Sequence, residues 1–148
     1  MRATPPLLQM MGGRKARPRK APKVRQREMR LHLDVARVLL DHAHPEWFWW
    51  HTPNGGKRDI ITASLFKKMG VKPGVFDFVL VAPGAVAHFL ELKREGESLS
   101  DAQEDFQNHA IRHGWPHSVA DTFDQALAVL DHWGCLRIRT GGADERAV

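Results

Sequence analysis

The feature that most constrains the fold is a pair of apolar segments, residues 75–81 and 86–92, separated by the sequence Ala-Pro-Gly-Ala. Both segments are rich in β-branched and large apolar side chains, which is typical of strands inside a sheet, and the Pro-Gly pair predicts a hairpin between them. Asp77 interrupts the first segment, Glu91 interrupts the second, and Lys93 follows it directly. Charged groups in a sheet interior cost free energy unless something pairs with them. The fold must therefore supply these three side chains with partners.

The length of the hairpin loop decides whether the charges meet. A two-residue turn leaves Asp77 opposite Leu90, with Glu91 on the other face of the sheet, whereas a three-residue loop ending at Ala85 places Asp77 opposite Glu91. Glu91 and Lys93 share a face in either case, because side chains alternate along a strand. A cluster of Asp77 with Glu91 thus requires the three-residue loop or a bulge with the same effect.

The rest of the chain predicts helices and strands in alternation. Ser100 and Gln103 have the spacing of a helix capping box, and Gly114 is a suitable end for that helix. We expect helices at about 28–42, 59–69, 101–113 and 122–133, strands at 47–52, 75–81, 86–92 and 117–120, and a last edge strand at 135–139. The order αβαββαβα predicts an α/β domain in which helices flank a mixed central β-sheet.

The charge of the chain is unevenly distributed. Residues 1–27 contain nine Lys and Arg and no acid, which leaves 13 bases against 17 acids in the remainder. We expect a disordered basic arm at 1–27, one domain at 28–140 and a disordered tail at 141–148. The arm is suited to neutralising phosphates. The alternatives are a solubilising extension, or a misassigned start ahead of Met10, Met11 or Met29.

Cysteine content and hydropathy exclude several classes of protein. Cys135 is the only cysteine, so an intramolecular disulfide and a multi-cysteine zinc site are excluded. No apolar run approaches the roughly 18 residues of a membrane span, and the N-terminus lacks the apolar core of a signal peptide. We therefore expect an intracellular, cytoplasmic protein that does not enter a membrane.

The charged residues of the hairpin are candidates for a metal site. In the three-residue register Asp77 and Glu91 would repel each other unless a cation lay between them. Oxygen ligands without thiolate favour Mg²⁺ or Mn²⁺. Glu28, on the apolar face of the first helix, is a candidate third carboxylate, and Lys93 could orient a water or stabilise a pentacovalent phosphate. The alternative is a simple Glu91–Lys93 ion pair, with Asp77 capping the end of a strand.

Three other groups of residues have a functional and a plain interpretation. The loop with two cations and exposed amides could bind a phosphate or be a surface turn; it comprises Asn54, Gly55, Gly56, Lys57 and Arg58. His109, His113 and His117 have ligand-like spacing but lack an HExxH motif, which favours a solvated face. The tryptophans at 47, 49 and 50 could stack on bases, but we expect core residues with one ring exposed.

Several motifs in the right order resemble one nuclease family. They are Glu28 on the first helix, PNGGKR at 53–58, GV-x-D at 74–77, ELK at 91–93 and LS-x-x-Q at 99–103. Over residues 28–133 the chain resembles the VRR-NUC branch of the PD-(D/E)XK nuclease superfamily, in its stand-alone phage or bacterial type. It departs from the family at Phe76, where the family usually has Pro before the catalytic Asp.

The resemblance implies a restriction-endonuclease-like core and a metal-dependent DNA endonuclease. Asp77 and Glu91 would bind Mg²⁺ or Mn²⁺ together with the backbone carbonyl of Leu92, and Glu28 would complete the acidic cluster. Lys93 would assist the attacking water. Gln103 would line the site, and residues 54–58 would contact DNA.

The expected substrate is branched or structured DNA in replication, repair or recombination, cut by a homodimer to leave 5′-phosphate and 3′-hydroxyl ends. One alternative is a catalytically inactive DNA-binding module on a nuclease fold. Another is a nucleic-acid-binding protein that acts through the basic arm alone.

Overall fold

The computed structural model describes residues 22–53 and 60–137, without the side chains of 22–27. Its elements follow the expected order αβαββαβα, so the predicted fold class is confirmed. They are α1 (Pro22–His42), β1 (Phe48–His51), α2 (Ile60–Lys68), β2 (Phe78–Ala82), β3 (Val86–Leu92), α3 (Asp101–His113), β4 (His117–Ala120) and α4 (Phe123–His132). The expected arm and tail fall largely outside the described residues.

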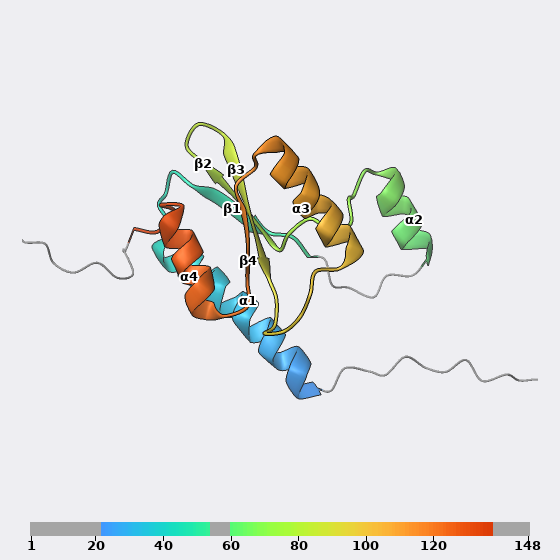
Figure 1. The fold of residues 1–148 in the computed structure, drawn as a ribbon, viewed down its shortest axis with the longest axis horizontal. Helices are drawn as coiled ribbons and strands as arrows, with labels where there is room; N and C mark the ends of the chain where they lie inside the picture. The colour runs from blue at the N-terminus through green and yellow to red at the C-terminus, as the bar shows by residue number, and fades with distance from the viewer. Residues whose placement is uncertain (1–21, 54–59, 138–148) are drawn as a thin grey trace, which may run out of the picture.

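The strands form one mixed sheet in the order β1-β2-β3-β4. β1, β2 and β3 are antiparallel neighbours, and β4 runs parallel to β3 after the crossover through α3. In Figure 1, α1 and α4 cover one face of the sheet, α3 lies against the other, and α2 stands apart beyond α3. The protein is thus a three-layer α/β domain around a small sheet.

The main core lies between the sheet and the α1–α4 pair. Alternate residues of β2 and β3 point into it, because side chains on a strand alternate between faces. Its buried members are Val35, Leu39, Phe78, Leu80, Leu90, Leu92, Ala120, Ala126, Leu130, Cys135 and Leu136. The side chains between them on β2 and β3, including Phe89, face α3, where Phe89 packs on Phe106 with ring centroids 5.1 Å apart.

The β2–β3 hairpin has the three-residue loop. Phe78 pairs with Leu90 and Ala82 with Val86, which is the register that carries Asp77 toward Glu91. Gly84 has φ 85°, and the amide of Ala85 donates to the carbonyl of Ala82 at 3.1 Å. Pro followed by a Gly with positive φ is the pattern of a type II turn. Of the two registers that the sequence left open, the structure has the one that a cluster of Asp77 with Glu91 requires.

Three boundaries differ from expectation. α1 begins at Pro22, six residues early, because Pro is well suited to a first helical position and the following residues are good helix formers. β2 begins at Phe78 rather than residue 75, since the amide of Asp77 donates to the side chain of Glu91 instead of to a strand carbonyl. The prediction of an edge strand at 135–139 is wrong for residues 135–137, the part that the structure describes. Leu136 forms one bridge with Ala43, just after α1, and does not join the sheet.

The expected caps of α3 are present, and α4 is capped as well. The side chain of Gln103 accepts from the amide of Ser100 at 3.0 Å, and Gly114 ends α3 with φ 65°. Thr122 caps α4, with its hydroxyl accepting from the amide of Gln125 at 3.2 Å. None of the helices in the described ranges is both long enough and apolar enough to cross a membrane.

Candidate active site

Asp77 lies directly before β2 and is held on both sides by the neighbouring chain segments. Its carbonyl accepts from the amide of Thr52 at 2.7 Å, which extends the β1 pairing by one residue. Its amide donates to Glu91 Oε2 at 3.2 Å, and its Oδ2 accepts from the amide of Leu92 at 2.9 Å. With a side chain 11% exposed, the carboxylate is nearly buried yet fixed in orientation.

Glu91, Lys93 and Gln103 form a connected group on the side of the sheet that faces α3. Lys93 Nζ lies 3.1 Å from Glu91 Oε1 and donates to Gln103 Oε1 at 2.7 Å. The side-chain nitrogen of Gln103, Nε2, donates to Glu91 Oε1. The Glu91 side chain is only 2% exposed, so these two partners compensate part of the cost of burying its charge.

Gln103 combines the two roles considered for it from sequence. Its side-chain oxygen accepts from the Ser100 amide, as a capping box requires, and also from Lys93. Its side-chain nitrogen reaches Glu91. The first turn of α3 is thus tied directly to the charged end of β3.

Gly74 and Phe76 position the segment that leads into Asp77. A Cβ on Gly74 would lie 2.0 Å from the carbonyl oxygen of Ala102, and its φ is +80°, so only glycine fits against the first turn of α3. Phe76 is fully buried, and its ring lies 5.0 Å from that of Phe106. Phe76 stands where the family usually has proline, and the packing of its ring against α3 holds the segment before Asp77 in place.

Glu28 lies beside this cluster, at the opening of a pocket. Its Oε2 is 3.9 Å from Nε of Arg94, and both residues line an open pocket of about 470 Å³ with Leu92 and Lys93. The structure therefore brings Asp77, Glu91, Lys93 and Gln103 into direct contact and places Glu28 at an adjoining opening.

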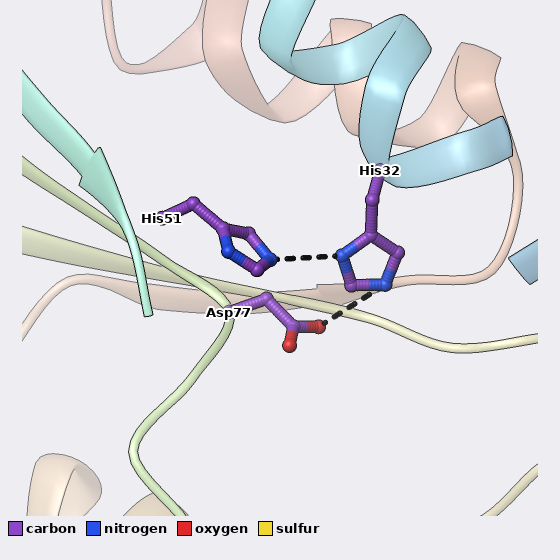
Figure 2. Close-up of side chains that lie close together, drawn as sticks. All are labelled: His32, His51 and Asp77. Carbon is purple, nitrogen blue, oxygen red and sulfur yellow. Dashed lines mark hydrogen bonds and ion pairs between the residues drawn. The ribbon is translucent and has the colours of Figure 1, made fainter. Parts of the chain in front are cut away.

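Two histidines that the sequence did not single out converge on Asp77 (Figure 2). Nε2 of His32, from α1, lies 3.7 Å from Asp77 Oδ2, and its Nδ1 lies 3.2 Å from Nε2 of His51, the last residue of β1. Both rings pack against Phe78, at centroid distances of 6.2 and 5.0 Å. The sequence held only a weak indication of these two histidines. His32 follows Glu28 by one helical turn, and His51 ends the strand that pairs beside Asp77.

Burial and neighbouring charge shift two pKa values at the site. Burial, and next the charge of Asp77, raise the pKa of Glu91 to about 7, although Lys93 opposes the shift. Burial, and next the charge of His32, lower the pKa of His51, while Asp77 acts in the other direction. The charged form of Glu91 is therefore disfavoured in this arrangement.

Replacing Glu91 by glutamine is expected to stabilise the metal-free protein at pH 8 by about 1 to 3 kcal/mol. The raised pKa means that the folded state holds a proton that the unfolded state has released, so wild-type stability falls as pH rises from 4.5 to about 7. Glu91→Gln removes this loss, and the two proteins should be equally stable at pH 4.5 or below. Denaturant unfolding in EDTA at pH 4.5 and 8 measures the difference.

The exposed Glu104 of α3 supplies the control. Glu104→Gln should leave the pH dependence as in the wild type, since that carboxylate is solvated. A Glu91→Gln variant no more stable than wild type at pH 8 would contradict the account of this buried charge.

The other candidate residues have three outcomes. Residues 54–58, the expected DNA-contacting loop, lie outside the described residues. His109 and His113 are exposed, with rings 4.4 Å apart, as expected for a solvated face. His117 differs from that expectation, because it is half-buried and its Nδ1 lies 2.8 Å from the carbonyl oxygen of Trp115. Trp50 is 43% exposed while the other two tryptophans are half-buried, as predicted.

A solved structure described as a VRR_NUC domain is similar to this chain, with a TM-score of 0.50 and 16% identity. The match covers 72% of this chain and 96% of the other. No family model matches the sequence, and no curated protein matches it. At this identity the similarity establishes the fold, and it agrees with the family that the sequence motifs resemble. The chain thus has the fold of a VRR_NUC domain.

Proposed function

We propose that the protein is a divalent-metal-dependent DNA endonuclease, with Asp77, Glu91, Lys93 and Gln103 as its active site. The observation that carries the proposal is a pair of buried acidic residues at the end of a hairpin: Glu91 contacts Lys93 and also accepts a hydrogen bond from the backbone amide of Asp77. A plain ion pair would need only Glu91 and Lys93, whereas here Asp77 adds a second negative charge and raises the pKa of Glu91. The VRR_NUC fold supports the same interpretation.

The donor set fits a divalent cation. Asp77 and Glu91 offer hard oxygen ligands, and a cation would relieve the repulsion that disfavours the charged form of Glu91. In the proposed enzyme these two carboxylates would hold Mg²⁺ or Mn²⁺, with the carbonyl of Leu92 and the nearby Glu28 as further ligands. The bound ion would supply Lewis-acid stabilisation of the charge that develops on the phosphate.

The protein groups have separate tasks in hydrolysis. Lys93, fixed by Glu91 and Gln103, would direct an ammonium proton toward the attacking water or a phosphate oxygen. As the water oxygen attacks phosphorus, it releases a proton to solvent; one P–O bond forms, the bond to O3′ breaks, and O3′ takes up a proton from solvent, which yields 5′-phosphate and 3′-hydroxyl ends. Gln103 would keep Lys93 and Glu91 in place through the first turn of α3.

The substrate and the assembly are parts of the same proposal. The loop 54–58 and the basic residues of 1–27 carry cations suited to phosphates. We infer that the protein is a homodimer, since cutting two strands or a junction takes two active sites. The expected substrate is branched or structured DNA in replication, repair or recombination, and the expected location is the cytoplasm.

Incubation with labelled DNA tests the proposal. Purified protein is mixed with duplex, flap, splayed and four-way-junction DNA in Mg²⁺, Mn²⁺ or EDTA, and products are resolved on denaturing gels. We expect cleavage with the metals and none in EDTA. Binding without cleavage would instead support an inactive DNA-binding module, and loss of binding on deletion of residues 1–27 would support a role for the arm.

Lys93→Ala provides a direct test of the proposed site. The substitution should abolish most cleavage while leaving metal binding by the carboxylates in place. Cleavage at the wild-type rate would exclude the proposed role of Lys93.

A further inference from the structure

We propose that His32, His51 and Asp77 form an imidazole-containing metal site that prefers Co²⁺, Ni²⁺ or Zn²⁺ to Mg²⁺. The inference rests on the proposed function, in which Asp77 is a metal ligand. It adds the two histidines as further ligands and names the class of ion that they favour. Among the described residues, this is the group of three potential ligands whose donor atoms all lie within 4.8 Å of one another.

The geometry is close to that of a bound ion. Ligands about 2.1 Å from a metal lie roughly 3 to 3.5 Å from each other at tetrahedral or octahedral angles. Nδ1 of His32 lies 3.2 Å from Nε2 of His51, whereas the other ring nitrogen of His32, Nε2, lies 3.7 Å from Asp77 Oδ2. With one donor atom taken from each residue, all three lie within 4.8 Å of one another. Rotation of the two imidazole rings would bring these three atoms to one ion, and His51 is exposed enough to rotate.

The three ligands are held by three different elements. α1 carries His32, the end of β1 carries His51, and Asp77 is fixed by the amide of Leu92 (Figure 2). Phe78, fully buried, packs against both imidazole rings. Metal sites are precise when their ligands project from packed elements, and this one meets that condition.

The two histidines reach Asp77 from the α1 side of the sheet, whereas Glu91 and Lys93 lie toward α3. His51 pairs with Phe78 and packs on its ring, so it faces α1, whereas Glu91 and Lys93 contact Gln103 of α3. Imidazole nitrogen favours later transition ions, and carboxylate oxygen alone favours Mg²⁺. Loss of an imidazole should therefore weaken Co²⁺ binding far more than Mg²⁺ binding.

Calorimetric titration of the full, metal-stripped chain with CoCl₂ and with MgCl₂ tests this site without DNA. His51→Gln and His32→Gln should each weaken Co²⁺ binding by about 10-fold or more, and change Mg²⁺ binding less than about twofold. Asp77→Asn should weaken both. Circular dichroism checks that each variant is folded, and His51→Ala serves if the glutamine variant is not.

His109→Gln is the matched control, because His109 and His113 are an exposed pair of imidazoles on α3, with ring centroids 4.4 Å apart. This variant should keep the tight site. Co²⁺ binding that is unchanged in both His32→Gln and His51→Gln, or that is lost only in His109→Gln, would overturn the inference. His32 and His51 would then be only a hydrogen-bonded pair beside Asp77.

Cleavage assays separate this inference from the proposed function. Co²⁺-supported cleavage should fall in His51→Gln while Mg²⁺-supported cleavage persists. Cobalt binding that needs both histidines, in a protein that cuts no DNA, would uphold the metal site and reject the nuclease. Magnesium-dependent cleavage together with histidine-independent Co²⁺ binding would uphold the nuclease and reject the histidine site.

Discussion

Asp77→Asn is expected to lower the rate of DNA cleavage on the order of 10³-fold, the size of effect seen when a group that stabilises developing charge is removed. Asparagine keeps an oxygen that can accept the hydrogen bond from the amide of Leu92, now 2.9 Å long, so the hairpin end should stay folded. What is lost is the negative charge that would hold a cation. Single-turnover cleavage of labelled DNA in saturating Mn²⁺ measures the change.

Asp34→Asn is the control for this substitution. Asp34 lies on α1, its side chain is 48% exposed, and its partner Arg30 is on the same helix. That variant should cut DNA at the wild-type rate. DNA affinity of Asp77→Asn, measured in EDTA by fluorescence anisotropy, should stay within a few-fold of wild type. Cleavage by Asp77→Asn at more than a tenth of the wild-type rate would remove Asp77 from the active site.

Gly74→Ala is expected to destabilise the fold by about 3 kcal/mol or more, because two penalties combine. The residue has φ +80°, which an alanine adopts only with strain, and the new Cβ would lie 2.0 Å from the carbonyl oxygen of Ala102. Relief of the clash would push the segment before Asp77 away from α3. The melting temperature should drop by about 10 °C, as measured by circular dichroism.

Gly70→Ala separates the clash from the backbone strain. Gly70 has a similar φ of +85°, but nothing lies within 4 Å of an added Cβ. This control should cost only about 1 to 2 kcal/mol, the strain of a left-handed alanine. Equal losses in the two variants would show that the contact with Ala102 contributes nothing.

The local parts of the fold were predictable because short-range chemistry determines them. The Pro-Gly pair in the 82–85 loop predicted the hairpin, and only two loop lengths were open; the structure has the three-residue loop, which carries Asp77 toward Glu91. The cap at Ser100 likewise followed from a pattern four residues long. In each case the residues that decide the structure are neighbours in sequence.

The parts that could not be predicted depend on distant segments. His51 reaches Asp77 only because β1 pairs with β2 so that His51 lies opposite Phe78, and no local pattern sets that register. The rotation of α1, which points His32 at Asp77 and leaves Glu28 near Arg94, depends on packing against α4 and the sheet. The apolar run at 135–139 had strand composition, but its described part bridges the end of α1.

The three-residue hairpin loop also has a consequence for the order of folding. Asp77 and Glu91 are brought together by a contact of short sequence separation, which closes quickly and at low entropic cost. Pairing of β3 with β4 closes a longer loop through α3, and the contact of His32 with Asp77 spans still more of the chain. We therefore expect the repelling carboxylates to meet early in folding, before Gln103 and the histidines arrive. A divalent cation present during refolding should then speed the early steps as well as stabilise the finished protein.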